Sequence, residues 1–470
     1  MAKSAVPQFV LTPLIAGVIA GPLAIGLVTP AGWATGVLVT ALCLLGWSLA
    51  VLAGRARVAV SPRLVVVPAS LYGLALLWAG LQLLPLGGLT HPLWSAAAET
   101  LDVPVPGAVS VSPHDTRDGL ARLVSYAGVF WLALQAGRSG PIADRLMAVV
   151  AITVGAYTLY GLAINLPGTA SLAVYARTVG GRFSGPLVNA NNFATLAGIG
   201  LIAATAVLYE GVRTATRGVE TAKERSRLKV EYVANRGWPY VITWVLGVSG
   251  LLLSQSRAGF LATMVALSVF FLVLALSQSR NRTNIWAAAS LAAGAVAVFV
   301  VLSGGRLLDR LAPETVNAQS HGRSEVYTTT LTAIGDAPLE GYGLGSFREV
   351  FRLYQPADLP GIWAMAHNTY LENALELGVP AAAALTLAVA WLAARCLFGA
   401  FQRRNRRALP AAAFAVSVLL GLHSAVDFPL QIPAITAFFA VLLGAGVAQS
   451  WSRDEATGLA DPAGQTASRL

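Results

Sequence analysis

Three arginines stand in short polar segments beside long apolar runs, where a charged side chain is costly. They are Arg182 in GRFSGPLVNANN, Arg257 in SQSRAGF and Arg323 in HGRSEVY. Arginine offers phosphate a planar, two-pronged set of donors and stays charged at any physiological pH. A single arginine at the edge of a membrane span is equally compatible with snorkelling to the lipid interface. Three of them on one side of a membrane, without matched local acids, favour an anionic ligand.

A second set of reactive side chains lies in the segment HNTYLENALELG. His367 and Asn368 precede a predicted helix, and a helix N-terminus favours the neutral imidazole that a general base requires. Glu372 and Glu376 are four residues apart and therefore share one face of that helix. The segment predicts either a catalytic His367 with Glu372 as its partner, or a capping His–Asn pair with two glutamates that face water.

Two further segments supply polar groups at the ends of apolar runs. Asn189, Asn191 and Asn192 begin one run, and asparagine is a good helix N-cap, which accounts for at least one of them. The others, like Asn368, have amides that can hydrogen-bond sugar hydroxyls. In HSAVDFPLQIP, Asp427 can hold an arginine in place or cap a turn, and we expect it to support the site rather than to react.

The sequence lacks the motifs of several classes of enzyme. It has no GxxxxGK[ST], no DxD and no HExxH, which argues against ATP hydrolysis, metal-dependent use of nucleotide sugars and zinc proteolysis. We therefore expect neither a metal site nor a cofactor.

The elements that must position these residues are membrane-spanning helices. The 470 residues are 56% hydrophobic and only 11% charged, against about 25% charged residues in a soluble domain. A helix that crosses the hydrocarbon core needs about 20 apolar residues. The sequence predicts an all-α membrane protein with about twelve spans, near residues 9–29, 33–53, 64–84, 120–137, 146–166, 191–210, 238–255, 258–277, 285–302, 378–397, 409–427 and 432–450.

The distribution of cations orients these spans. With both termini in the cytoplasm, 22 of the 32 Lys and Arg lie inside, as the positive-inside rule requires. The net charge of +10 is then explained by membrane lipids, and no nucleic-acid partner is expected. We predict a single polytopic domain over residues 1–470. Its other predicted parts are a basic cytoplasmic loop at 211–237 near anionic lipid heads, a cytoplasmic tail at 451–470, and a long outer loop at 303–377 with helical stretches at Ser324–Ile334 and His367–Leu377.

In combination, GRFSGPLVNANNFA, LSQSRAGF, GRSEVYTTTLTAIGDAPLEGYGLGSF, HNTYLENALELG and HSAVDFPLQIP resemble the O-antigen ligase and polymerase superfamily of bacterial membrane glycosyltransferases. The clear resemblance covers about residues 180–450, and the earlier spans match only in number. One departure is Tyr327, where the family pattern has a tryptophan after the arginine of this helix.

The resemblance implies a C-type-like membrane glycosyltransferase in the bacterial inner membrane, with its active site in the periplasm. The family's donor is a glycan on undecaprenyl pyrophosphate, and the acceptor is a glycan or the lipid A core. The family's pyrophosphate-binding arginines would fall on Arg182, Arg257 and Arg323, and its catalytic histidine on His367. Asn189, Asn192, Asn368 and Asp427 remain candidates for supporting or sugar-binding roles.

Other functions stay open at this level. A polymerase uses the same donor chemistry as a ligase, and the motifs do not separate the two. An oligosaccharyltransferase acting on protein is related, but no appended periplasmic domain is evident. A transporter or flippase of lipid-linked glycans would suit twelve spans, although the arginines lie at one membrane face rather than at its middle, and no matched pair of broken helices signals inverted repeats. A structural scaffold leaves the costly outer arginines unexplained.

Overall fold

The computed structural model describes residues 4–165, 182–278, 313–403 and 405–452. Within these ranges the chain is helical, apart from turns and one isolated bridge between Ser4 and Ala56. The helices are α1 (Gln8–Ala20), α2 (Pro30–Leu52), α3 (Val66–Leu81), α4 (Leu93–Leu101), α5 (Pro113–Gly137), α6 (Gly140–Ile164), α7 (Ala190–Ala215), α8 (Ala222–Tyr232), α9 (Trp238–Ser254), α10 (Arg257–Gln278), α13 (Pro313–Asp336), α14 (Phe347–Tyr354), α15 (Thr369–Leu377), α16 (Val379–Gln402), α17 (Ala408–Ser424) and α18 (Pro433–Ala448).

Length and apolar composition make many of these helices fit to cross a membrane. Eight helical stretches meet that description: α2, Pro62–Leu81, α5, α6, α7, Ala222–Ser254, Arg257–Ser277 and α16. Three shorter apolar helices, Gln8–Leu23, α17 and α18, accompany them. Every predicted span except one overlaps one of these stretches. The predicted span at 285–302 lies outside the described residues, so the count of twelve stays a prediction.

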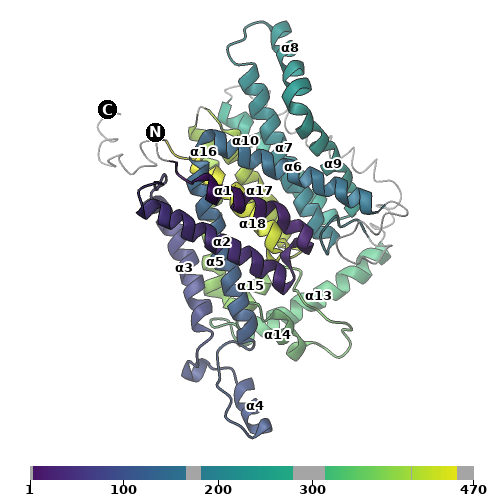
Figure 1. Cartoon of the computed structure of the whole chain (residues 1–470). Coiled ribbons are helices and arrows are strands. Elements are labelled where there is room, and N and C mark those ends of the chain that lie inside the picture. Colours follow the sequence, from purple (N-terminus) through teal and green to yellow (C-terminus); the bar gives the residue numbers. More distant parts are fainter. Residues whose placement is uncertain (1–3, 166–181, 279–312, 404, 453–470) are drawn as a thin grey trace, which may run out of the picture.

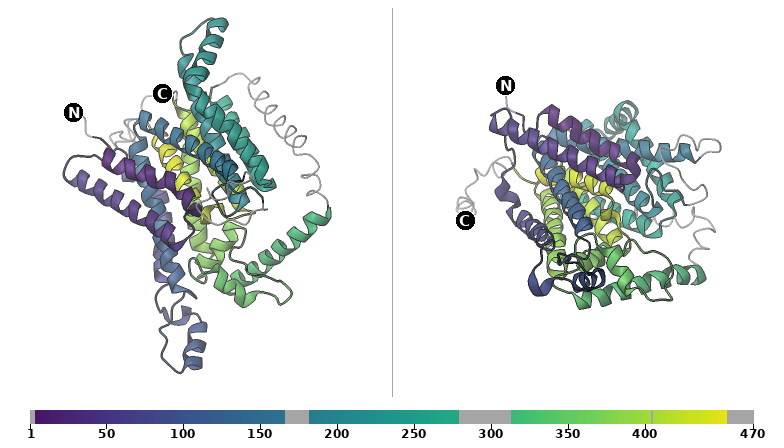
Figure 2. Two further views of the ribbon diagram at one scale, coloured as in Figure 1. Left: turned by 45° about the vertical axis from the view of Figure 1, so that its right-hand side comes forward. Right: turned by 60° about the horizontal axis from the view of Figure 1, so that its bottom comes forward.

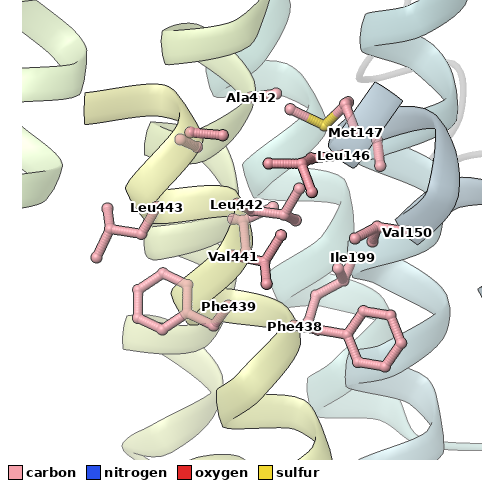
Figure 3. Close-up of a cluster of buried hydrophobic side chains, with 14 of the residues drawn as sticks. Leu146, Met147, Val150, Ile199, Ala412, Phe438, Phe439, Val441, Leu442 and Leu443 are labelled. Carbon is pink, nitrogen blue, oxygen red and sulfur yellow. The ribbon is translucent and has the colours of Figure 1, made fainter. Parts of the chain in front are cut away.

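The core of the bundle forms around α18 and its neighbours (Figure 1). Helix α18 packs along α5 and α17, and α7 packs against α6, α9 and α17. Phe438 and Leu442 of α18 are fully buried, together with Met147 of α6 and Ile199 of α7 (Figure 3). Burying these side chains against other helices rather than lipid places α7, α17 and α18 at fixed positions, and these are the helices whose ends carry Asn191 and Asp427.

The described part of the long predicted outer loop forms a compact helical layer at one end of the bundle. Helices α13, α14 and α15 share a small apolar cluster that includes Val326, Tyr342, Phe347 and Leu375. Helix α8 projects from the opposite end of the molecule (Figures 1 and 2). Helix α13 contains the predicted stretch Ser324–Ile334 and α15 ends at the predicted Leu377, whereas α14 was not predicted. Residues 303–312 lie outside the described part of this loop, and so do residues 453–470 of the predicted tail.

Candidate active site

The candidate site is centred on Asp427, in the turn between α17 and α18. The backbone N–H groups of Val426 and Asp427 both donate to the carbonyl of His423, which closes the last turn of α17. Pro429 follows and cannot continue an α-helix without loss of a backbone donor. The Asp427 side chain is only 1% exposed, and its Oδ1 accepts the N–H of Phe428 at 2.9 Å. The carboxylate is thus held in one orientation, at the end of the bundle where α13, α14 and α15 lie.

His367 faces this carboxylate. Its Nδ1 lies 3.6 Å from Asp427 Oδ1, within ion-pair distance, and its side chain is 22% exposed. The ring also packs edge-on against Phe428, with 4.9 Å between ring centroids. The backbone of His367 has φ +52°, an uncommon conformation for a residue other than glycine. Tyr327 Oη donates to the His367 carbonyl at 2.8 Å and secures that conformation. The arrangement turns Nδ1 toward Asp427.

Arg323 reaches the same carboxylate from another helix, and Arg182, in the segment before α7, is linked to it through Asn191. Arg323, on α13, places Nη2 3.9 Å from Asp427 Oδ2 and donates through Nη1 to the carbonyl of Val426 at 3.2 Å. Arg182 Nη2 donates to Asn191 Oδ1 at 2.9 Å. The Asn191 amide nitrogen in turn donates to Asp427 Oδ2. One guanidinium group and one imidazole therefore lie within ion-pair distance of a single buried carboxylate, and a second guanidinium is linked to it through Asn191.

Arg257 lies in a turn that Arg182 also contacts. Arg182 Nε donates to the carbonyl of Ser254 at 3.0 Å, and Arg257 opens α10 three residues later. Gln255 between them has φ +52°, which makes the sharp reversal from α9 to α10. The three predicted arginines therefore belong to one region at the same end of the bundle.

The electrostatics keep Asp427 ionised. Burial alone would raise the pKa of this carboxyl, but the nearby imidazoles of His367 and His423 and the N–H of Phe428 outweigh burial and lower the pKa below its ordinary value. Arg182 and Arg323 bring two guanidinium groups to the region of this carboxylate. Guanidinium groups are also the donors that suit an anionic ligand such as a pyrophosphate.

The predicted asparagines divide into structural and buried ones. Asn189 is the N-cap of α7, and its side chain accepts the N–H of Asn191 at 2.7 Å. Asn368 is the N-cap of α15 and donates to the carbonyl of Ala425 at 2.9 Å. Asn192 is fully buried, and among the described residues its amide atoms have no hydrogen-bond partner. Asn191, which makes the bridge to Asp427, was not among the candidates for a supporting or sugar-binding role. Its position two residues after the N-cap Asn189 does not reveal which distant residue its side chain contacts.

Glu372 and Glu376 are buried on α15 rather than facing water, so that part of the capping alternative is wrong. Glu372 is 3% exposed, and its Oε2 accepts the N–H of Ala366 at 2.8 Å. Glu376 Oε1 accepts the N–H of Phe347 at 3.2 Å. Burial raises the pKa of both carboxyls above the ordinary value. At Glu372 the negative charge of Glu376 raises the pKa further. Glu372 thus anchors the peptide immediately before His367.

A buried pair lies behind Asp427. Thr195 Oγ1 and His423 Nδ1 are 2.6 Å apart, and both side chains are fully buried. His423 lies in the last turn of α17. The pair links α7 to α17 directly beneath the turn that carries Asp427.

Comparison with known proteins bears on the same segments. The family model described as O-antigen ligase matches residues 242–386, a stretch that contains Arg257, Arg323 and His367. No curated protein matches the chain. Residues 242–386 thus match the O-antigen ligase family, and this match supports a place for the chain in the O-antigen ligase and polymerase superfamily.

Proposed function

We propose that the protein transfers a glycan from undecaprenyl pyrophosphate to a sugar hydroxyl, on the periplasmic side of the bacterial inner membrane, without a metal ion. The observation that carries the proposal is the placement of His367 Nδ1 3.6 Å from Asp427, with Arg323 on the same carboxylate. A carboxylate behind an imidazole orients the ring and stabilises its protonated form during proton transfer. An adjacent cluster of arginines suits the departing pyrophosphate.

In the proposed reaction the acceptor hydroxyl attacks the anomeric carbon of the donor glycan. His367 takes the hydroxyl proton as the new C–O bond forms. The bond between the anomeric carbon and the pyrophosphate oxygen breaks, and that oxygen leaves with the electron pair. Arg182, Arg257 and Arg323 stabilise the negative charge that develops on it. A single displacement of this kind inverts the anomeric centre.

Glu372 acts in this proposal as a positioning residue. Its contact with the Ala366 N–H fixes the backbone that carries His367, and its burial keeps it away from an incoming sugar. Asn191 has the corresponding task for Arg182, because it ties that guanidinium to Asp427.

The acceptor decides between ligase and polymerase, and one product analysis tests both. The purified protein is given a synthetic undecaprenyl-pyrophosphate glycan in EDTA, first alone and then with lipid A core oligosaccharide. Glycan on the core identifies a ligase, which is the outcome we expect. Lengthened glycan without any core identifies a polymerase with the same donor chemistry. Donor binding without turnover under both conditions would contradict the transferase proposal and favour a transporter.

A further inference from the structure

A large apolar cavity lies at the end of the bundle away from Asp427. It has a volume of about 530 Å³ and opens between α7, α9 and α10, within the range of small-molecule sites. Its walls are mainly apolar and aromatic, and they include Leu208, Val212, Trp244 and Phe271, with Arg213 at the edge. Arg213 lies 22 positions after Asn191 on α7, or about 33 Å along a helix axis. The cavity is therefore at the opposite membrane face from the candidate active site.

The cavity is part of a tightly built corner of the fold. A π-helical turn, Val233–Gly237, joins α8 to α9, and Val233 lines the cavity. Such turns are rare and recur at functional sites. The ring of Tyr232 lies so close to α7 that a Cβ atom at Gly211 would overlap its hydroxyl. This contact packs Tyr232, at the end of α8, against α7.

The segment that contains Arg213 and Val233 of the cavity lining is rich in basic residues. Residues 210–237 contain seven Lys and Arg but only four Glu. Arg213 forms an ion pair with Glu210 at 3.1 Å, and the cations of α8 are exposed. Trp244, 41% exposed, also lines the cavity, and tryptophan favours the interface between lipid tails and headgroups. Basic pockets between membrane helices bind anionic lipid heads.

We propose that this cavity binds one anionic diacyl phospholipid. One acyl chain occupies the apolar space between α7, α9 and α10. The headgroup phosphate lies beside Arg213, the one basic residue in the cavity lining. The combination of an apolar cavity and an arginine in its lining fits such an amphiphile, and the inference does not depend on the reaction at His367.

Native mass spectrometry of the full chain tests the proposal. Delipidated protein in detergent is mixed with equimolar phosphatidylglycerol and phosphatidylcholine of the same acyl chains. Wild type should retain phosphatidylglycerol in preference, and Arg213→Gln should reduce that preference about fivefold, as expected for one basic residue near a lipid head. Because Arg213→Gln leaves Glu210 without its ion-pair partner Arg213, the double variant Glu210→Gln/Arg213→Gln removes both charges. It should show the same loss of preference for phosphatidylglycerol as Arg213→Gln. Val241→Trp, at a half-exposed cavity position, should weaken binding of both lipids.

Arg227→Gln is the matched control. The Arg227 side chain is 79% exposed on α8, so this substitution removes the same charge at a position outside the cavity. It should keep the wild-type preference. Equal retention of the two phospholipids by wild type would overturn the proposal, and so would an equal effect of Arg227→Gln and Arg213→Gln. Displacement of phosphatidylglycerol by a stoichiometric amount of undecaprenyl phosphate would assign the cavity to a polyprenyl lipid instead. Thermal unfolding of each variant verifies that it is folded.

Discussion

His367 and Asp427 come from separate segments of the chain, yet His367 Nδ1 lies 3.6 Å from Asp427 Oδ1. The same aspartate is within ion-pair distance of Arg323 and, through Asn191, is linked to Arg182. A single carboxylate therefore sets the orientation of the proposed base and of two proposed donor-binding residues. The consequences for activity and stability can be measured one residue at a time.

Asp427→Asn should lower the rate of glycan transfer by about 100-fold or more, because general-base catalysis is typically worth that much and the imidazole loses the carboxylate that orients it. The effect should fall on kcat more than on KM if donor contacts through Arg182 survive. Steady-state kinetics at saturating donor measure it. Glu325→Gln, an exposed change on the neighbouring helix α13, should keep wild-type kinetics. A wild-type kcat in Asp427→Asn would remove Asp427 from the mechanism.

Asn191→Leu should weaken donor binding by about 10- to 100-fold, because Arg182 and the buried Asp427 each lose a charge-assisted hydrogen bond. Direct titration with the lipid-linked donor measures the change. Asn189→Ser is the matched control two residues away, since serine is a comparable N-cap for α7. If both variants bind donor like wild type, the bridge through Asn191 has no part in holding the pyrophosphate.

Glu372→Gln and Glu376→Gln should each make the protein more stable than wild type at alkaline pH. The folded-state pKa of each glutamate carboxyl is raised above its ordinary value of 4.5. The stability that each neutral carboxyl contributes is therefore fully present below pH 4.5 and is lost as the pH rises through the raised pKa. A glutamine stays neutral and avoids this loss. Each glutamine retains an oxygen to accept the N–H of Ala366 or Phe347. Thermal unfolding in detergent at about pH 5 and about pH 8 should show a gain of about 1–3 kcal/mol only at the higher pH. A gain that is the same at both pH values would contradict this account.

Gly343→Ala should destabilise the fold by about 1–3 kcal/mol. Gly343 has φ +108°, and a Cβ atom there would overlap Ser110 Oγ. Its N–H donates to the carbonyl of Glu376 at 2.8 Å, so a shift of this turn would also disturb α15. Gly335→Ala is the matched control, because Gly335 lies in α13 with open space around it, and alanine is the better helix former. Midpoints of thermal unfolding should move in opposite directions, and equal shifts would refute the steric explanation.

Much of the helical framework could be predicted because its physical signal is local. Long apolar runs predict the positions of α2, α6 and α16, and the caps at Asn189 and Asn368 follow from the preference of asparagine for helix N-termini. The residue types of the site were also recognisable, since phosphate chemistry favours arginine and proton transfer favours histidine. Helix α14 gave no such signal, because its amphipathic pattern is short and its apolar face is explained only by the cluster that it shares with α13 and α15.

The connections within the site could not be predicted, because they depend on how distant elements pack. The bridge from Asn191 to Asp427 requires α7 to lie beside the turn after α17. The burial of Glu372 and Glu376 requires the turn around Gly343 and the start of α14 to cover α15. The hydrogen bond from the Tyr327 hydroxyl to the His367 carbonyl could not be expected from the family pattern, which has a tryptophan at this position. None of these relationships leaves a periodic or compositional trace in the sequence.

The most direct test of the account is the initial rate at which purified protein releases undecaprenyl pyrophosphate from a synthetic lipid-linked glycan, with acceptor and EDTA present. We predict that wild type releases undecaprenyl pyrophosphate only when acceptor is present. In His367→Ala the rate should fall by at least about 100-fold, with donor affinity unchanged. Release by His367→Ala at the wild-type rate, or activity that disappears in EDTA and returns with a divalent cation, would contradict a metal-free transfer in which His367 is the base.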